Sequence, residues 1–361
     1  MEGFPAREKV EAMCKERTTS RREFLRNCVA GAVAINTAGQ STPSFPGRAV
    51  APPARSRVSI ARDPLLRGAP RRETGSSQGG NRVDPTRILV LLDQAVHGII
   101  NAGDPSGAWT KAVRPGQRVG LKVNTLGGRG LSTNVLLVEA ICERLREAGI
   151  KASDIVIWDR DSEELERAGF RIRSGGNQVQ CYGTDRVGYS DYLASFGSVG
   201  SRLSKILIER CDVLINVPVL KDHDGAGVTI ALKNMYGVIH NPNKYHPDGC
   251  NPYIADVNAL PELRCRLRLH ICDATTACFE GGPGFKPQFA WRANTLIVST
   301  DPVALDYSGW QMIERKRAAE GLKTLTAEGR APNYIATAAD ARHRLGNNDP
   351  RRITVVETQV A

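Results

Sequence analysis

The sequence lacks the features that mark several common functional classes. Aromatic residues make up only 6% of its 361 residues, whereas proteins that bind single-stranded nucleic acid stack the bases on aromatic side chains. It also lacks the His-Glu-x-x-His pattern of zinc proteases, and its one Gly-x-Ser-x-Gly match, at residues 75–79, lies in a Gly/Ser-rich stretch and not at the strand-to-helix turn that serine hydrolases need. No apolar run approaches the roughly 20 residues that a membrane-spanning helix needs. We therefore expect no nucleic-acid partner and no membrane span in the mature protein.

The positive charge belongs mainly to the N-terminal quarter of the chain. Residues 1–87 contain 16 Lys and Arg against 8 Asp and Glu, whereas residues 88–361 contain 33 against 30. A nucleic-acid-binding domain usually carries its basic residues on one folded face. The uneven distribution of the net charge of +11 is therefore a second argument against a nucleic-acid partner.

Cysteine spacing excludes a locally encoded metal cluster. The chain has nine cysteines, and no two of them form a Cys-x-x-Cys pair. The sequence therefore has no built-in ferredoxin-type iron–sulfur motif and no zinc knuckle. Most of these cysteines stand in apolar surroundings, which favours core positions. Cys272 and Cys278 flank a short polar stretch, and for them a disulfide or a shared metal is the alternative.

The first 39 residues have the features of an export signal. Arg21 and Arg22 precede Glu-Phe-Leu and a run of small residues of modest hydrophobicity. That run is too short to span a bilayer, and a twin-arginine signal is read by a receptor instead of serving as an anchor. We expect residues 1–39 to engage the twin-arginine export machinery as a partner. The predicted location is periplasmic or otherwise extracytoplasmic.

Composition divides the remainder into a linker and a folded domain. Residues 40–84 are rich in Pro, Gly, Ser and Arg and cannot bury enough apolar surface to fold alone. We expect a largely disordered linker there, interrupted by a first strand at 57–61. Residues 85–361 are expected to form an α/β domain.

Apolar strand patterns alternate with helical patterns along this domain. Strands are expected at 118–124, 154–159, 178–183, 212–220, 266–274, 294–300 and 353–357, and helices at 86–102, 133–150, 162–170, 227–239, 253–263 and 302–322. This alternation predicts a mostly parallel sheet covered by helices on both faces.

Polar residues follow five of the predicted strands. They are Asn124, Asp159, the pair Lys221 and His223, Asp273, and Asp301. In open α/β sheets, ligands bind beyond the carboxyl ends of the strands. If the sheet is parallel throughout, these side chains meet at one edge, and this edge is the predicted site.

Each residue type indicates a role at that edge. Lys221 and His223 are candidate catalytic residues, because neighbouring cations lower one another's pKa and favour acid–base chemistry. Asp273 is a third candidate, as a general base or a metal ligand. Asp159 and Asp301 are candidate metal ligands. The sequence does not identify a cofactor. A metal ion is one candidate.

A second group is suited to an anionic ligand or cofactor. Its members are Asn124, Gly127, Gly128, Lys233 and Asn234. Glycines ahead of a helix expose backbone N–H groups that bind anions, although a simple turn is equally compatible with the Leu-Gly-Gly-Arg-Gly stretch. Lys233 is predicted to share a helix face with Thr229, four residues earlier.

These elements together resemble the family known as domain of unknown function 362. The matching stretches are VGLKVN with its glycine loop, NVPVLKDH followed by GVTIALKNMYG, DATTACFEGGPG, and STDPVALD, in this order over residues 57–357. The resemblance implies an exported or redox-associated protein, and some family members carry a four-iron ferredoxin module that this sequence lacks. The family has no assigned reaction.

Two functions are compatible with the sequence. The first is an exported enzyme, of redox or proton-transfer type, with an edge pocket for a small anionic ligand or cofactor. The second is a periplasmic carrier that binds a ligand or metal in the same pocket without catalysis. The sequence does not decide between them.

Overall fold

A computed structural model describes residues 54–68, 82–100 and 105–361. Residues 1–39, which are expected to be a twin-arginine signal, and most of the expected linker lie outside the described residues. In the part of the chain that is described, no helix is both long and apolar enough to cross a membrane.

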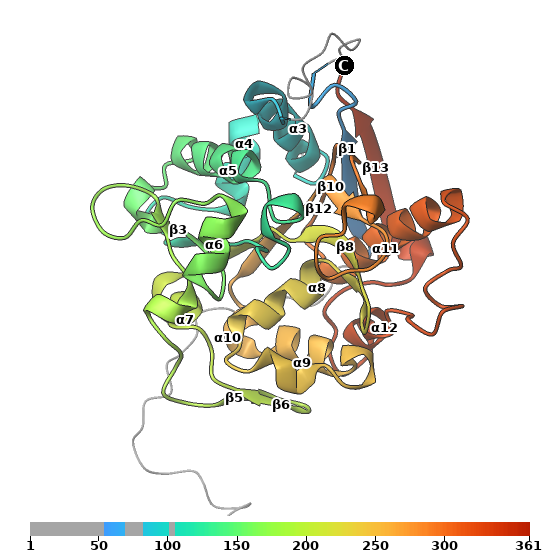
Figure 1. Ribbon diagram of the computed structural model, residues 1–361. Helices are drawn as coiled ribbons and strands as arrows, with labels where there is room; N and C mark the ends of the chain where they lie inside the picture. Colours follow the sequence, from blue (N-terminus) through green and yellow to red (C-terminus); the bar gives the residue numbers. More distant parts are fainter. Residues whose placement is uncertain (1–53, 69–81, 101–104) are drawn as a thin grey trace, which may run out of the picture. The chain divides into compact units, whose positions relative to one another are not determined.

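Thirteen strands and ten α-helices make up the described fold (Figure 1). The strands are β1 (Ser56–Arg62), β2 (Val119–Lys122), β3 (Ile155–Trp158), β4 (Gln180–Cys181), β5 (Ala194–Phe196), β6 (Val199–Ser201), β7 (Val213–Asn216), β8 (Val219–His223), β9 (Gly227–Thr229), β10 (Leu267–Cys278), β11 (Ala290–Trp291), β12 (Thr295–Ser299) and β13 (Ile353–Gln359). The helices are α3 (Pro85–His97), α4 (Pro105–Ala112), α5 (Val135–Glu147), α6 (Ser162–Ala168), α7 (Lys205–Arg210), α8 (Ala231–Asn234), α9 (Tyr253–Ala259), α10 (Pro261–Arg264), α11 (Pro302–Ala319) and α12 (Tyr334–Ala339).

The main sheet is mixed but mostly parallel, as predicted. Its strand order is β13-β1-β12-β10-β7-β2-β3-β4. Strands β10, β7, β2, β3 and β4 run parallel to one another, and β1 runs parallel to β13. Strand β12 is antiparallel to both of its neighbours, β1 and β10. Its carboxyl end therefore lies at the opposite edge of the sheet from the ends of β2 and β3.

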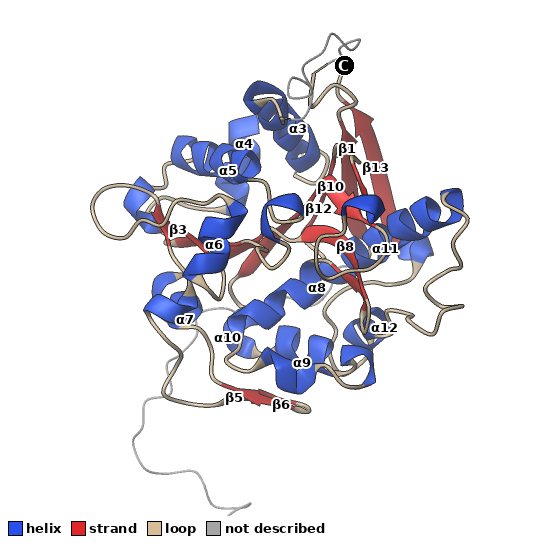
Figure 2. Cartoon of the chain, in the orientation of Figure 1, coloured by secondary structure: helices blue, strands red, loops and turns tan. Residues whose placement is uncertain are grey.

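Helices cover both faces of the sheet (Figure 2). Successive residues of a strand point to opposite faces, and in β7 Leu214 belongs to one hydrophobic core whereas Val213 and Ile215 belong to the other. Helices α3, α4 and α5 pack in the core with Ile215, and helices α7, α8, α9 and α11 pack in the core with Leu214. Strands that are buried on both faces have continuous apolar sequences, which is the pattern of a doubly covered sheet.

Strand β1 extends the folded unit upstream of residue 85. The strand expected at 57–61 is present, and it pairs with β12 on one side and β13 on the other. The C-terminal strand β13 is the outermost strand on this side of the sheet. Residues from both ends of the described chain are therefore needed for the same sheet.

Helix starts follow the capping rules that the sequence displays. Asp84 accepts hydrogen bonds from the backbone N–H groups of Thr86 and Arg87 at the start of α3, and Asp301 does the same for α11. In each helix a proline occupies the first turn, where the missing N–H has no intrahelical partner. The cap of α5 is Asn134, whose side chain accepts from the backbone N–H of Leu136.

The strand expected over 212–220 is divided into β7 and β8, and the helix expected over 253–263 into α9 and α10. Strand pairing changes two further predicted elements. The helix expected over 227–239 begins only at Ala231, because residues 227–229 form β9, which pairs with β8 as an antiparallel hairpin. The strand expected to end near residue 274 continues to Cys278. In both places pairing with β8 decides the structure, and a partner strand is not visible in local sequence.

The seven cysteines of the described fold all have free thiols. Cys272 and Cys278, the pair singled out by the sequence, both lie buried in β10 without a disulfide between them. Among the described residues, no group of three or more His, Cys, Asp or Glu side chains is placed to hold a metal ion.

Candidate functional site

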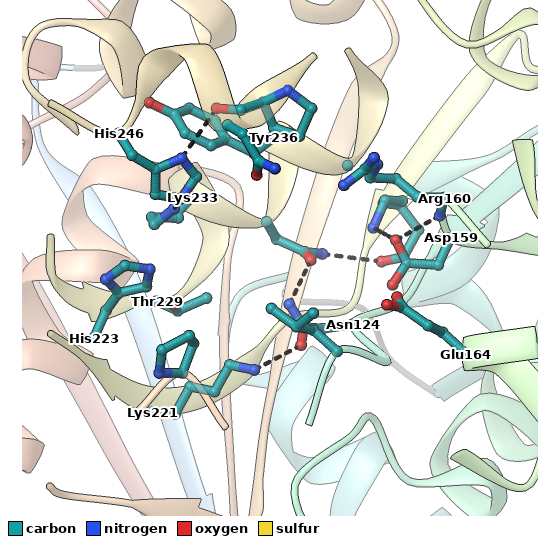
Figure 3. A pocket seen from close by; sticks show the side chains of 17 residues that line it. Asn124, Asp159, Arg160, Glu164, Lys221, His223, Thr229, Lys233, Tyr236 and His246 are labelled. Carbon is teal, nitrogen blue, oxygen red and sulfur yellow. Dashed lines mark hydrogen bonds and ion pairs between the residues drawn. The ribbon is translucent and has the colours of Figure 1, made fainter. Parts of the chain in front are cut away.

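A cavity of about 170 Å³ lies at the carboxyl ends of β2 and β3, beside the β8–β9 hairpin (Figure 3). It is lined by Lys122, Asn124, Leu126, Asp159, Arg160, Glu164, Lys221, His223, Thr229, Lys233, Asn234, Tyr236, Gly237, Pro242, Asn243, His246 and Pro283. Six of the predicted site residues are in this group. The structure thus brings together side chains from positions 124 to 234 at the edge where the sequence places a site.

Strand β8 directs Lys221 and His223 to the cavity. These residues are two positions apart, so they project from the same face of the strand, and Thr229 of β9 pairs with Lys221. Thr229 and Lys233 both line the cavity, but not on one helix face as the sequence suggested, because Thr229 belongs to a strand. The β8–β9 hairpin, and not the predicted helix, brings Thr229 to the cavity that Lys233 also lines.

Asp222 points to the other side of β8 and anchors the loop of residues 280–284, which forms part of the cavity wall. Its carboxylate accepts a hydrogen bond from the backbone N–H of Gly282 at 2.8 Å and pairs with Arg330 at 3.2 Å. The next residue of that loop, Pro283, lines the cavity. The Glu-Gly-Gly-Pro-Gly stretch is therefore tied to the same strand that carries Lys221 and His223.

A one-way chain of hydrogen bonds fixes the floor of the cavity. Lys221 Nζ donates to Asn124 Oδ1 at 3.0 Å, and Asn124 Nδ2 donates to Asn234 Oδ1 at 3.0 Å. Asn234 Nδ2 then donates to Asn216 Oδ1 at 2.7 Å, and Asn216 Nδ2 donates to the carbonyl of Ala231 at 2.9 Å. Every amide in this chain has its orientation set by its neighbours, so the acceptor offered to Lys221 is a neutral oxygen.

His223 is held as a neutral hydrogen-bond donor. Its Nδ1 accepts from the backbone N–H groups of Gly225 and Ala226, each at 3.1 Å, which leaves the proton on Nε2. Burial lowers the pKa of His223 to about 3, with Lys233 and His246 as further causes. Asp224 Oδ1 lies 3.0 Å from the same Nδ1, but an ion pair there would need a proton on an atom that already accepts two hydrogen bonds.

Lys233 has a different environment. Its Nζ lies 3.3 Å from His246 Nε2 and 4.3 Å from the centroid of the Tyr236 ring. His246 Nδ1 lies 3.0 Å from the carbonyl of Pro242, to which it donates, so His246 Nε2 accepts from the ammonium. Burial lowers the pKa of Lys233, whereas the aromatic face of Tyr236 favours its charged form.

Lys122 is the lysine of the cavity that has a carboxylate partner. Its Nζ lies 2.7 Å from Asp159 Oδ1, and the other oxygen of Asp159 accepts from the N–H and the hydroxyl of Thr125, each at 2.9 Å. Within the described ranges, no carboxylate forms an ion pair with Lys221 or Lys233. With Arg160 and Glu164 on the same wall, the lining carries four cations against two carboxylates, and the excess charge resides on Lys221 and Lys233.

Asp273 lies outside the cavity. It is buried in the middle of β10, where its carboxylate accepts from the backbone N–H groups of Asn134 at 2.7 Å and Thr275 at 2.8 Å. The strand that was expected to deliver Asp273 at its end runs on for five more residues. Asp273 therefore braces the start of α5 instead of joining Lys221 and His223.

Asp301 lies at the opposite edge of the sheet because β12 is antiparallel. Its carboxylate caps α11 and also accepts from Ser56 Oγ and from the backbone N–H of Asn347. The two candidate metal ligands, Asp159 and Asp301, are thus not brought together, and both carboxylates are already occupied by protein donors.

Gly127 and Gly128 shape the loop after β2 and do not line the cavity. A side chain at position 127 would place its Cβ 2.3 Å from the carbonyl oxygen of Leu131, and Gly128 has a φ of +62°. The close approach and the left-handed conformation both require glycine. The positions of Gly127 and Gly128 therefore support the interpretation of the Leu-Gly-Gly-Arg-Gly stretch as a turn.

Sequence reasoning missed the residue that supports Lys233 and Asn234. Asp306 of α11 is fully buried, and its Oδ1 accepts from the backbone N–H of Ala231 at 2.7 Å while Oδ2 lies 3.2 Å from that of Leu232. Helix α8 has no side-chain cap of its own. The two aspartates of the Asp-Pro-Val-Ala-Leu-Asp stretch thus cap two different helices, and the second one positions the site.

Two known proteins are similar to this chain. The chain is 27% identical over 267 residues to the thylakoid-associated protein sll1697 of Synechocystis, covering 70% of this chain and 78% of that protein. It is also similar to the solved lactate racemase apoprotein of Thermoanaerobacterium thermosaccharolyticum, with a TM-score of 0.38 and 13% identity. That similarity covers 64% of this chain and 55% of the other, so the chain spans about half of that structure's length.

The family assignment rests on a match to a family model. Residues 119–311 match the family described as domain of unknown function (DUF362). This range is more than half of the chain, and it contains every residue of the cavity together with Asp306. The chain belongs to the DUF362 family.

Proposed function

We propose that the cavity binds a small anion and that Lys221 exchanges a proton with the bound ligand. The observation that carries this proposal is the presence of two buried lysines, Lys221 and Lys233, whose ammonium groups have no carboxylate partner in the described fold. Burying an unpaired charge is costly, so such lysines are expected where a ligand supplies the missing negative charge. A carboxylate or a phosphate group fits this requirement.

The volume and the lining limit the size of the ligand. A cavity of about 150 Å³ holds a molecule as large as benzene, so a volume of about 170 Å³ accommodates an anion of a few heavy atoms. His223 Nε2–H supplies a neutral donor beside the two lysines. Leu126, Pro242 and Pro283 contribute apolar surface to the lining.

Lys221 is the best placed group for acid–base chemistry. Burial lowers its pKa to about 8, which brings its proton exchange close to neutral pH, where general acids and bases are most effective. Asp159 is not available as a base because Lys122 and Thr125 occupy it. This occupation also favours the alternative function, a carrier that holds the same anion without catalysis.

Lys233→Met is expected to weaken anion binding by about 10- to 100-fold, which corresponds to the loss of one charge-assisted hydrogen bond. Isothermal titration calorimetry with inorganic phosphate, sulfate, acetate and pyruvate measures this effect. Lys151→Met is the matched control, because Lys151 is exposed at the amino end of β3 and its loss changes the net charge equally. Equal affinity in the two variants contradicts the proposal. Binding without turnover of any tested ligand favours the carrier.

The export prediction is tested separately. Replacing both Arg21 and Arg22 with lysine is expected to retain the full-length protein in the cytoplasm, because the twin-arginine receptor reads the arginine pair itself. Fractionation of the host followed by immunoblotting measures the distribution. Unchanged export of the double variant contradicts the assignment of residues 1–39 as a twin-arginine signal.

A further inference from the structure

The two unpaired lysines of the cavity are held in ways that favour different chemistry. Lys233 faces the ring of Tyr236 and the Nε2 atom of His246, and the aromatic face stabilises a cation. Lys221 has one acceptor, the neutral oxygen of Asn124, and its side chain is fully buried. An amide oxygen accepts a hydrogen bond from a neutral amine as well as from an ammonium group. Burial lowers the pKa of Lys221 from 10.5 to about 8.

A buried amine next to a fixed cation is the arrangement that a nucleophilic lysine needs. The neutral amine is the form that attacks a carbonyl carbon, and a second cationic group nearby helps to keep it neutral. Lys233 contributes to lowering the pKa of Lys221 and can bind the carboxylate of a ligand at the same time. The flexible four-carbon stem of a lysine allows its amine to turn from Asn124 into the cavity.

We propose that the anion of this cavity is a small 2-oxo acid and that Lys221 Nζ forms an imine with its carbonyl carbon. The inference rests on the proposed anion site and names the chemical class of its ligand. The cavity volume of about 170 Å³ requires the carbonyl and the carboxylate to be close neighbours, because both lysines face the same small space. Lys233 binds the carboxylate, and His223 Nε2–H donates a hydrogen bond to the carbonyl oxygen.

The reaction balances without any further reagent. The lone pair of neutral Lys221 Nζ forms a C–N bond, while the carbonyl π electrons move to oxygen, which takes a proton and becomes the hydroxyl group of a carbinolamine. The C–O bond then breaks, and the oxygen leaves as water with the two hydrogens that the amine has lost. No oxidant or reductant takes part, and the imine returns to the oxo acid and the amine by hydrolysis.

Reductive trapping tests this assignment. The full chain is incubated with glyoxylate, pyruvate or 2-oxobutyrate in the presence of cyanoborohydride, which reduces the imine to a stable secondary amine, and the modified lysine is located by peptide mass spectrometry. We expect trapping at Lys221 at least about 10-fold faster than at exposed Lys151, because the neutral fraction of a lysine rises tenfold for each unit by which its pKa falls. Lys221→Met is expected to remove the adduct.

Two further measurements separate this inference from the anion site itself. Lys233→Met is expected to slow trapping at Lys221 by about 10-fold or more through weaker carboxylate binding, and inorganic phosphate is expected to compete with the oxo acid. If anions bind in calorimetry but none of the three oxo acids modifies Lys221 ahead of Lys151, the imine is overturned and the anion site stands. If neither binding nor trapping occurs, both are overturned.

Discussion

Replacing Lys221 with methionine is expected to stabilise the ligand-free protein by about 2 kcal/mol at pH 7. A lysine whose pKa falls from 10.5 to about 8 on folding costs about 3 kcal/mol wherever it must be charged in the folded state. Methionine removes this cost and fills a similar volume. It also leaves the Oδ1 atom of Asn124 without its donor, which offsets about 1 kcal/mol of the gain. Chemical denaturation of both proteins measures the difference.

The sign of the pH dependence makes this prediction specific. Because the folded-state pKa of Lys221 is lowered, the unfolded chain binds more protons between pH 8 and 10.5, and the stability of the wild type rises with pH in that window. The advantage of Lys221→Met is therefore complete below pH 8 and is lost as the pH approaches 10.5. Other titrating groups are common to both proteins and cancel in the difference.

Lys151→Met provides the control for the removed charge. Lys151 is exposed, so its replacement is expected to change stability by less than about 0.5 kcal/mol at any pH. A pH dependence of Lys221→Met that is parallel to that of the wild type would show that Lys221 is not desolvated in the folded protein. The same result would remove the physical basis for its proposed reactivity. A gain in stability at the expense of binding is the usual relation between function and stability at a ligand site.

Asp306→Ala is expected to destabilise the protein by about 3 to 4 kcal/mol, because it leaves two buried backbone N–H groups without an acceptor. These donors belong to Ala231 and Leu232 at the start of α8, and the hydroxyl of Tyr334 loses its contact at 3.2 Å as well. Helix α8 carries Lys233 and Asn234 into the cavity. We therefore expect weaker anion binding together with the loss of stability, as measured by denaturation and calorimetry.

Two variants separate the positioning role of Asp306 from a general loss of stability. Burial raises the pKa of Asp306 to about 8, so the carboxyl group is mostly protonated at pH 7, and Asp306→Asn is expected to cost only about 1 kcal/mol. Asp301→Ala removes the cap of α11 at the opposite edge of the sheet, where it is expected to lower stability without changing anion affinity. If Asp306→Ala and Asp301→Ala affect affinity equally, Asp306 does not position the site.

Local sequence was sufficient for features that depend on near neighbours. Asp84 and Asp301 cap their helices as their Asp-Pro dipeptides predict, and the apolar runs of β2, β3 and β7 are buried strands. The polar residues Asn124 and Asp159, which follow β2 and β3, lie at one edge of the sheet because those strands are parallel. Asn124, Asp159, Lys221 and His223 line one cavity, as their places after predicted strands indicated.

The sequence by itself determined the alternation of elements, the edge at which the cavity lies, and six of the seventeen residues that line it. Only the tertiary structure decided the direction of β12, the length of β10 and the hairpin of β8 with β9. These features removed Asp301 and Asp273 from the site and revealed the role of Asp306. Strand direction and pairing depend on contacts between residues that are distant in the chain, and no periodicity or capping signal within one segment carries that information.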